Sequence, residues 1–403
     1  MNPVYRKRII LGVTGSIAAY KAVEIASTLT KMGALIDVIL SAGGEKFVTP
    51  LTFRSVTGRA ACTNESLWTS EDHIPHITLG HTADCAVVAP ASANAMADIA
   101  LGKGDTLLPL TILASDCPLL IAPAMDGHMY QNPATQANIE TIRRRGGIFI
   151  GPEYGRFASG MTGLGRFSEP EKVVGAIRYQ LSRPNDLRGK KIVITAGGTR
   201  EALDPVRFLT NRSSGKQGFA LAQAALDRGA DVTLITTVEA LPEPYGAAVQ
   251  KVDSAKEMLA AVLENLPGAD ALVMCAAVAD FRPRAVAAQK IKKTGESLTV
   301  ELEATQDVLL EVAKTRCRYP GLKIVAGFAA ESEDLLVNAE KKMKRKRLDL
   351  IVANDISAKD RGMGADDNAA TILFADGSRK EIPLMKKDAL AAEVIEAIAG
   401  KLR

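Results

Sequence analysis

The sequence predicts an α/β protein made of two Rossmann-like, doubly wound parallel-sheet domains in tandem. Two stretches open in the same way: an apolar strand leads through a turn of small residues into a helix, and a second strand follows. The first stretch covers residues 8–40 and the second covers 190–236. Further apolar segments alternate with helical segments in both halves, which is typical of parallel sheets with helices on both faces. These segments are residues 85–90, 119–125, 271–277, 323–330 and 348–354.

The length and one polar segment indicate where the domains meet. A chain of 403 residues is long enough for two domains that each have a full hydrophobic core. The segment SRPNDLRGKK at 182–191 is polar, contains proline and glycine, and follows a helix expected near 170–181. We therefore expect a front domain at 1–183, a linker at 184–190 and a back domain at 191–403.

The composition is that of an ordinary globular protein. Hydrophobic residues make up 47% of the chain and charged residues 24%, and the net charge of +4 gives little support to nucleic-acid binding. No apolar run reaches the roughly 18 residues that a membrane span needs, and the start of the chain lacks the pattern of a signal peptide. The five cysteines form no CxxC pair. We therefore expect reduced thiols, a cytoplasmic location, and neither nucleic acid nor membrane as a partner.

Polar residues follow the first strands of the front half, where a parallel sheet binds its ligands. Four residues precede the first helix, and their N–H and hydroxyl groups could hold one phosphate at the positive end of that helix. A tight structural turn would look the same. Three more polar residues at the next strand ends could add donors, which suggests a mononucleotide cofactor. The candidates are Thr14, Gly15, Ser16 and Ile17, then Ser41, Ser92 and Asn94.

A nicotinamide enzyme is the first alternative. Such an enzyme needs the spacing G-x-G-x-x-G after the first strand and an acidic residue at the end of the second strand. The first turn here reads Gly12-Val-Thr-Gly15-Ser16, and the second strand ends in Leu40-Ser41. The corresponding strand of the back half ends in two threonines, so a dinucleotide hydride enzyme is disfavoured in both halves.

Five motifs of the front half resemble the phosphopantothenoylcysteine decarboxylases. They are TGSIAAYKA (14–22), PHITL (75–79), APASANAMADIALG (89–102), PAMDGHMY (123–130) and ASGMTGLGRFSEPE (158–171). The resemblance covers nearly all of residues 5–181. It implies a homo-oligomeric enzyme that binds FMN, and this flavin would oxidise the substrate thiol so that the neighbouring carboxylate can leave as CO2.

The resemblance implies a catalytic base, and the chain departs from the family pattern at two positions. His76 matches the family's catalytic histidine, although from chemistry alone His73 is an equal competitor. The family carries asparagine where this chain has Asp126, whose charge would repel the substrate carboxylate unless it is protonated, or would aid the reaction if that repulsion vanishes as CO2 leaves. The family's flap carries cysteine where this chain has Ser159, so the final reduction must take another route.

The back half resembles phosphopantothenate–cysteine ligase from Leu187 to the end. Its motifs are ITAGGTREALDPVRFLTNRSSGKQG (194–218), CAAVADFRP (275–283), QKIKK (289–293), GFAAE (327–331) and KRKRLDLIVANDI (344–356). The resemblance implies that CTP, the nucleotide of the bacterial type, activates 4′-phosphopantothenate as an acyl-cytidylate that cysteine then attacks. Together the two resemblances imply a bifunctional enzyme of coenzyme A biosynthesis, which ligates first and then decarboxylates the product to 4′-phosphopantetheine.

Several residues of the back half are candidates for the nucleotide site. Ser213, Ser214 and Gly215 at a helix start offer donors to phosphate. The resemblance implies that Asn211 handles the acyl intermediate and that Asp280 lies beside the nucleotide and its Mg²⁺; alone they would pass as a helix cap and a loop carboxylate. Lysines would neutralise the triphosphate, although a solvated basic face is the alternative. The resemblance implies the remaining contacts, which are Lys290, also expected to be catalytic, Phe328, Lys344 and Lys346.

Two matters stay open at the level of sequence. Loss of the flap cysteine allows a front half that binds FMN as a non-catalytic regulatory domain beside an active ligase, although the retention of His76 argues against it. The resemblance also implies threefold contacts from the decarboxylase and twofold contacts from the ligase. On one chain these contacts would close into a dodecamer built from trimers and dimers.

Overall fold

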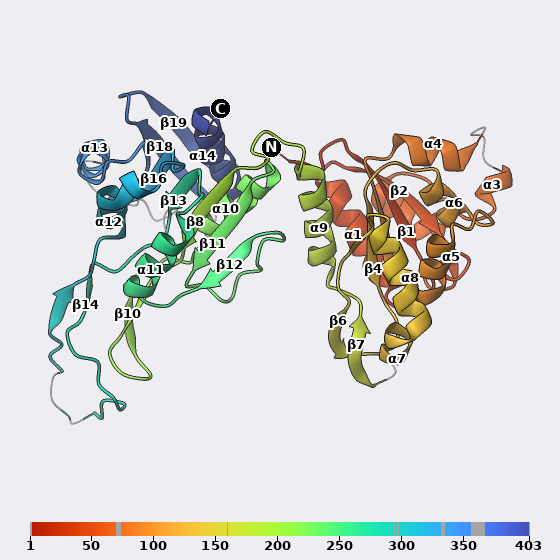
Figure 1. Cartoon of the computed structure of the whole chain (residues 1–403), viewed down its shortest axis with the longest axis horizontal. Helices are drawn as coiled ribbons and strands as arrows, with labels where there is room; N and C mark the ends of the chain where they lie inside the picture. Colours follow the sequence, from red (N-terminus) through yellow and green to blue (C-terminus); the bar gives the residue numbers. More distant parts are fainter. Residues whose placement is uncertain are drawn as a thin grey trace. The chain divides into compact units, whose positions relative to one another are not determined.

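The computed structural model describes residues 2–69, 74–158, 160–293, 295, 298–331, 335–355 and 367–402. The chain divides into two compact units, residues 2–182 and 183–403 (Figure 1). No helix among the described residues is long and apolar enough to cross a membrane.

The front unit is a five-stranded parallel sheet in the order β2-β1-β3-β4-β5. Its strands are β1 (Arg8–Val13), β2 (Leu35–Leu40), β3 (Cys85–Ala91), β4 (Leu119–Pro123) and β5 (Ile148–Phe149). Its helices are α1 (Ala19–Lys31), α2 (Pro50–Thr57), α3 (Ser66–Thr69), α4 (Pro75–Thr82), α5 (Ala93–Leu101), α6 (Leu107–Leu113), α7 (Gly127–Gln131), α8 (Pro133–Arg144) and α9 (Pro170–Ser182). The chain reverses its direction of winding between β1 and β3, and such a switch point is where doubly wound sheets bind ligands.

Apolar periodicity explains how the first helix joins this sheet. The apolar residues Ala22, Ile25, Ala26 and Leu29 recur at helical spacing in the sequence, and all four are buried in α1. Every residue of the central strand β3 is buried as well, as expected for a parallel strand covered on both faces. A separate hairpin, β6 (Glu153–Arg156) with β7 (Thr162–Arg166), precedes α9.

The back unit is an eight-stranded sheet in the order β12-β11-β8-β13-β16-β17-β18-β19. Its strands are β8 (Lys191–Ala196), β11 (Asp231–Thr236), β12 (Ala248–Lys251), β13 (Ala271–Met274), β16 (Ile324–Glu331), β17 (Leu350–Asp355), β18 (Asp367–Phe374) and β19 (Arg379–Lys386). Its helices are α10 (Lys216–Asp227), α11 (Ala255–Asn265), α12 (Val308–Thr315), α13 (Leu335–Lys346) and α14 (Lys387–Leu402).

The fold class is the one predicted, and only the edge of this sheet departs from a parallel arrangement. The first six strands are parallel, but β18 runs antiparallel to β17, and β19 runs antiparallel to β18. The turn between them contains Gly377 at a φ of +86°, a conformation that glycine adopts without strain. An antiparallel edge hairpin needs only such a short turn and no crossover helix, so it interrupts the strand–helix alternation on which the prediction rested.

Two small ladders stand outside the main sheet of the back unit. β9 (Arg200–Ala202) pairs with β10 (Phe208–Thr210), and β14 (Phe281–Pro283) pairs with β15 (Leu302–Ala304). We call the described residues of 200–210 and 281–304 the arm; it projects from the back unit in Figure 1. Seven of its large apolar side chains are exposed, namely Val206, Phe208, Phe281, Val286, Leu298, Val300 and Leu302.

Candidate active sites

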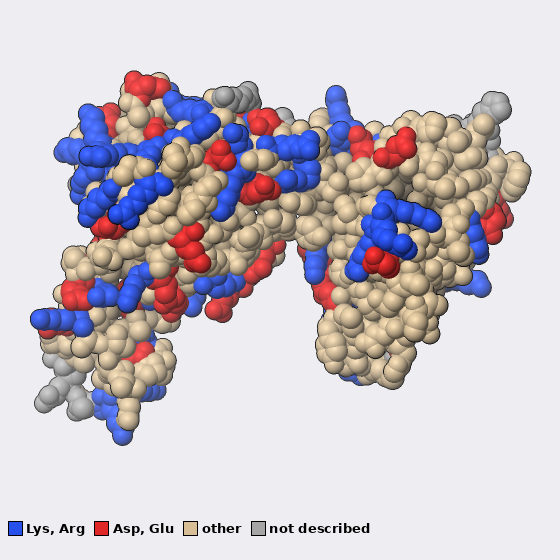
Figure 2. Space-filling view, in the orientation of Figure 1, with Lys and Arg blue, Asp and Glu red and all other residues tan. Residues whose placement is uncertain are grey.

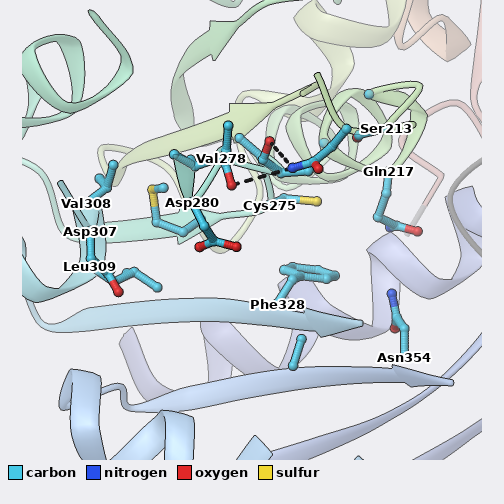
Figure 3. A pocket seen from close by; sticks show the side chains of 18 of the residues that line it. Ser213, Gln217, Cys275, Val278, Asp280, Asp307, Val308, Leu309, Phe328 and Asn354 are labelled. Atoms are coloured by element: carbon cyan, nitrogen blue, oxygen red, sulfur yellow. Dashed lines mark hydrogen bonds between the residues drawn. The ribbon is translucent and has the colours of Figure 1, made fainter. Parts of the chain in front are cut away.

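The back unit contains a cavity of about 370 Å³ at the carboxyl ends of its central strands. It lies between the start of α10, the loop after β13 and strands β16 and β17 (Figure 3). Most of the residues expected from the sequence meet here. They are Asn211, Ser213, Ser214, Gly215, Asp280, Phe328 and Lys346.

The start of α10 forms one wall of this cavity. Gly215 is the N-cap residue and has a φ of +75°, which favours glycine. Gly218 lies so close to β8 that an added Cβ would be 2.4 Å from the Cβ of Ala196. The first turn is therefore pressed against the sheet, and the positive end of the helix faces the cavity beside Ser213 and Ser214.

The loop after β13 forms an adjoining wall of the cavity. The Nδ2 of Asn211 donates to the carbonyl oxygen of Ala277 at 3.1 Å, and its distance to the carbonyl oxygen of Val278 is 3.5 Å (dashed lines in Figure 3). The N–H of Thr305 donates to the carbonyl oxygen of Asp280 at 2.9 Å, which anchors this loop from below. The carboxylate of Asp280 is exposed, so it is available to a ligand.

The basic side chains of α13 differ from the sequence expectation. Lys346 lines the cavity, and its Nζ lies 2.8 Å from the Oδ2 of Asp307. Lys342, which was not predicted, also lines it and donates to the carbonyl oxygen of Phe328 at 2.9 Å. Lys344 is exposed and does not line the cavity, because residues four apart share a helix face and residues two apart do not. Figure 2 shows the outward basic side chains of this region gathered where α13 lies.

Asp307 connects the cavity to α12. Burial raises the pKa of its carboxyl, but the hydrogen bond and charge of Lys346 and the N–H of Leu310 bring the pKa below its ordinary value. Its Oδ1 accepts from that N–H at 3.2 Å and so caps the helix. The lysine is therefore held in place by a carboxylate that is itself fixed.

Lys290 lies outside the cavity of its own chain. It is exposed and belongs to the arm, in the segment between β14 and β15. The sequence expectation that it joins the other nucleotide contacts is therefore not met among the described residues lining this cavity.

Several lining residues were not among the candidates named from the sequence. Lys387 starts α14 and is only 7% exposed, and Gln217 Nε2 lies 3.4 Å from its carbonyl oxygen. Burial raises the pKa of Cys275 to about 12, and the charge of Lys387 opposes this rise only in part. The Oε1 of Gln217 and the Oδ1 of Asn354 are buried without a hydrogen-bond partner among the described residues.

In the front unit, three strand ends meet as the sequence predicted. The hydroxyl of Thr14 is buried; it donates to the carbonyl oxygen of Pro90 at 2.7 Å and accepts from the N–H of Ser92 at 2.9 Å. The backbone of Gly15 lies against Gly43, so a Cβ there would be 3.1 Å from the Cα of Gly43. The ends of β1, β2 and β3 therefore form one continuous backbone surface in front of α1.

The other expected flavin contacts hold this surface together. Ser41 Oγ accepts from the N–H of Gly44 at 3.1 Å, and Ser92 Oγ accepts from the N–H of Ala95 at 3.3 Å as the cap of α5. Ser16 Oγ accepts from the N–H of Ala18 at 3.3 Å, and Ile17 is exposed. Asn94 is also exposed, and its amide donates to the Oδ2 of Asp98 on the same helix at 3.0 Å.

His76 is the second residue of α4, directly after Pro75. Its Nδ1 is buried and has no hydrogen-bond partner among the described residues. A buried, unpartnered ring nitrogen is costly unless a ligand or water completes it, which makes this atom a candidate for substrate contact. The competitor His73 and the flap residue Ser159 lie outside the described residues.

Asp126 caps a short helix. Its Oδ1 accepts from the N–H of His128 at 2.9 Å, at the start of α7. The N–H of Met125 donates to the carbonyl oxygen of Gly165 at 3.0 Å, which ties β7 to this turn. Backbone contacts thus place the carboxylate of Asp126 beside the β6–β7 hairpin.

Comparison with known proteins assigns each half. A family described as "Flavoprotein" matches residues 3–182, and one described as "DNA/pantothenate metabolism flavoprotein C-terminal domain" matches 187–402. The coenzyme A biosynthesis bifunctional protein CoaBC of Vibrio cholerae is 43% identical over 400 residues, which is 99% of each chain. The protein of the same name from Bacillus subtilis is 42% identical over 397 residues, covering 98% of this chain and 97% of that protein.

Solved structures match each half separately. The C-terminal domain of a CoaBC protein is 38% identical with a TM-score of 0.46, covering 54% of this chain and 98% of that one. The FMN-dependent cysteine decarboxylase SpaF is 29% identical with a TM-score of 0.38, covering 42% and 96%.

Proposed function

The chain belongs to the family of bifunctional coenzyme A biosynthesis proteins, and from this premise we propose which substrates and residues serve its two activities. It combines a flavoprotein decarboxylase domain with a ligase domain. We assign residues 1–183 to the decarboxylase, 184–190 to the linker and 191–403 to the ligase. The division into two compact units supports this assignment.

The back domain, in this proposal, joins 4′-phosphopantothenate to cysteine with CTP. Direct condensation of a carboxylate with an amine is unfavourable in water, so the carboxylate first attacks the α-phosphate of CTP. This step forms an acyl-cytidylate and releases pyrophosphate; the amine of cysteine then attacks the acyl carbon and releases CMP. The supporting observation is the cavity that combines a helix start with Lys342 and Lys346, because both features stabilise phosphate charge.

Individual residues of this cavity receive distinct roles. Ser213, Ser214 and Gly215 would bind phosphate oxygens at the start of α10. Asn211 would hold the acyl intermediate, since it lines the cavity just before the start of α10 and its amide is fixed by the loop after β13. Phe328 would pack against the nucleotide, because its ring projects into the cavity in Figure 3.

Magnesium fits the site through Asp280. The described residues include no group of three or more His, Cys, Asp or Glu side chains that could hold a metal by themselves. Mg²⁺ with a nucleotide needs only one or two carboxylates, because phosphates and water supply the other ligands. The exposed carboxylate of Asp280 at the cavity suits that mode of binding.

The front domain, in this proposal, decarboxylates 4′-phosphopantothenoylcysteine with FMN. The backbone of residues 14–17 at the start of α1 would hold the phosphate of the flavin, with Ser41, Ser92 and Asn94 nearby. Gly15 fits this role, because its contact with Gly43 leaves backbone rather than a side chain at the surface. When bound, the flavin would supply the two-electron oxidation that lets CO2 leave, and it would return the two electrons to the decarboxylated product.

His76 and Asp126 would act on the substrate itself. His76 would accept the thiol proton through a ring nitrogen, and its unpartnered Nδ1 supports a contact with ligand. Asp126 would face the substrate carboxylate while capping α7. Because Ser159 replaces the family cysteine, the product would be reduced without a thiol at this position.

Assembly and location complete the proposal. The exposed apolar side chains of the arm support a homo-oligomer, and Lys290 would then reach the nucleotide bound to a second copy. A dodecamer of trimers and dimers is the expected closure. A cytoplasmic location is supported by the cysteines, none of which forms a disulfide; all five lie in described parts of the chain.

One incubation tests both activities. The purified chain is supplied with 4′-phosphopantothenate, cysteine and either CTP or ATP, and pyrophosphate, CO2 and 4′-phosphopantetheine are followed together. We expect pyrophosphate with CTP and CO2 release afterwards. Absence of pyrophosphate with both nucleotides would refute the ligase proposal, and ligation without CO2 would show a front domain that binds flavin without turnover.

A further inference from the structure

A carboxylate is buried inside the arm, in a turn that the proposed chemistry does not use. Asp204 is 3% exposed and follows β9 at the tip of the β9–β10 hairpin. Its Oδ1 accepts from the N–H groups of Val206 and Arg207, both at 2.8 Å. These two bonds fix the turn itself.

The other oxygen of this carboxylate reaches a different segment of the chain. Asp204 Oδ2 accepts from the N–H of Ile291 at 3.1 Å, across 87 positions of sequence. Ile291 is the residue directly after Lys290, in the lysine-bearing segment 289–293. The carboxylate therefore fixes the backbone from which Lys290 projects.

Arg207 forms hydrogen bonds with both Asp204 and Ile291. Its Nε and Nη2 donate to Asp204 Oδ2 at 2.9 and 2.6 Å, and Nη2 also donates to the carbonyl oxygen of Ile291 at 2.7 Å. Both backbone groups of Ile291 are thus held by one charged pair. The N–H of Ala287 donates to the carbonyl oxygen of Leu203 at 3.0 Å, so the hairpin holds this loop at a second point.

The charge of Asp204 is secured by its surroundings. The hydrogen bond from Arg207 holds the pKa of this carboxyl well below its usual range; burial raises the pKa, but the N–H groups of Val206, Ile291 and Arg207 lower it further. The carboxylate stays ionised at any pH at which the enzyme would be assayed. We call the contacts that join Asp204 and Arg207 to Ile291 the clamp. The clamp is therefore present throughout the assay range of pH and is not a pH-sensitive contact.

Lys290 needs such a clamp if it is to bind phosphate. Its side chain is exposed, and a lysine side chain has large rotational freedom that must be lost when it binds a ligand. A mobile backbone would add to that loss and lower the effective concentration of the ammonium group at the triphosphate. Fixing Ile291 removes the backbone part of this cost.

We propose that Asp204 is a positioning residue for Lys290, because it fixes the lysine-bearing segment to the β9–β10 turn and so directs Lys290 at the nucleotide phosphates. The proposal rests on the ligase function given above. It differs from a purely structural role, in which Asp204 would stabilise the arm without affecting CTP through Lys290.

A double-mutant cycle separates these two roles. Asp204→Asn keeps the size of the side chain but places an amide N–H₂ against the donors of Ile291 and Arg207. In the full chain we expect kcat/KM for CTP to fall by about 10-fold or more, measured by pyrophosphate release. In a Lys290→Ala background the same change should cost less than about twofold, because the residue through which it acts is already gone.

Controls and contrary results are defined within the same arm. Glu301→Gln breaks an exposed ion pair with Arg284, 2.9 Å long, and should leave kcat/KM for CTP unchanged. Equal losses from Asp204→Asn in both backgrounds, or no loss in either, would overturn the proposal. No loss from Lys290→Ala alone would overturn the role of the lysine, whereas no pyrophosphate from the unmodified chain would overturn the ligase function.

A second variant keeps the proposal testable if Asp204→Asn does not fold. Arg207→Lys retains the positive charge but loses the forked contact with both Asp204 and Ile291. We expect a smaller loss in kcat/KM for CTP, again dependent on Lys290. Hydrogen exchange should then rise in residues 289–293 while β8 and β13 stay protected; unchanged exchange in that segment would contradict the clamp.

Discussion

The two domains use the same place in the same kind of fold in different ways. In the back domain, the strand ends and the start of α10 leave a cavity of about 370 Å³, and polar groups such as Asp280 and Lys346 line it. In the front domain, the polar side chains at the strand ends bond to neighbouring backbone, as Thr14 does with Pro90 and Ser92. The comparison teaches that a hydroxyl at a strand end can shape a ligand surface without being free to contact the ligand.

The largest effect is expected at His76. We expect His76→Asn to lower CO2 release from supplied 4′-phosphopantothenoylcysteine by about 100-fold or more, because the base for the thiol is lost. Bound flavin, measured by its absorbance, should stay at the wild-type level, since no expected phosphate contact is changed. A variant that keeps its rate of CO2 release would remove His76 from the mechanism.

The matched change in the front domain is His81→Asn. His81 lies in the last turn of the same helix and has no proposed role. We expect its rate of CO2 release to stay within about twofold of wild type. Equal losses from both histidine variants would indicate damage to α4 rather than loss of a base.

The second effect tests which lysines of α13 contact the nucleotide in the ligase cavity. Lys346→Ala should raise KM for CTP by about 10-fold, since it removes a cation from the phosphate site and leaves Asp307 without its partner. Lys344→Ala is the control, because this lysine is exposed on another face of α13. Pyrophosphate release at varied CTP concentration measures both, and a larger effect from Lys344 would contradict the geometry.

The same pair of lysines shows what sequence could and could not predict. The motif predicted basic contacts to the nucleotide, but a run of six basic residues and one methionine at 341–347 does not reveal which members face the cavity. The position of α13 against β17 decides this, and it selects Lys342 and Lys346. By contrast, the buried face of α1 was predictable because its apolar residues recur at helical spacing.

Contacts between segments that lie far apart in the sequence could not be predicted either, because only the folded structure brings them together. Nothing in the sequence indicates that the backbone of Lys387 meets Gln217, since 170 positions separate them. The residues of β18 and β19 also gave no signal of an antiparallel edge, because most of β19 is exposed and the strand contains Pro383. Ser213 was predictable because small polar residues at a helix start can bind phosphate. The loop with Asp280 follows a strand at the edge where parallel sheets bind ligands, but the role of Asp280 was implied only by the resemblance.

A small effect is expected at Asp126. Asp126→Asn keeps a side-chain oxygen that can accept from the N–H of His128, so the cap of α7 should persist. We expect CO2 release to stay within about threefold of wild type. Complete loss of turnover with flavin still bound would show that the negative charge itself is required.

The smallest effect concerns the order in which the cysteines react with an alkylating reagent. It leaves both activities unchanged. Because burial raises the pKa of Cys275 to about 12, its thiol stays protonated near neutral pH and should resist alkylation. Cys317 is exposed and should react first with iodoacetamide. Mass spectrometry of peptides after timed labelling measures the order; early modification of Cys275 would contradict the raised pKa of its thiol.

The most direct test of two separate active sites is CO2 release by the Asn211→Ala chain. This variant should fail to form pyrophosphate, because the residue assigned to the acyl intermediate is missing. When 4′-phosphopantothenoylcysteine is supplied directly, we predict CO2 release within about twofold of wild type, since His76 and the flavin surface lie in the other domain. Loss of CO2 release together with pyrophosphate formation would contradict the assignment of one activity to each domain.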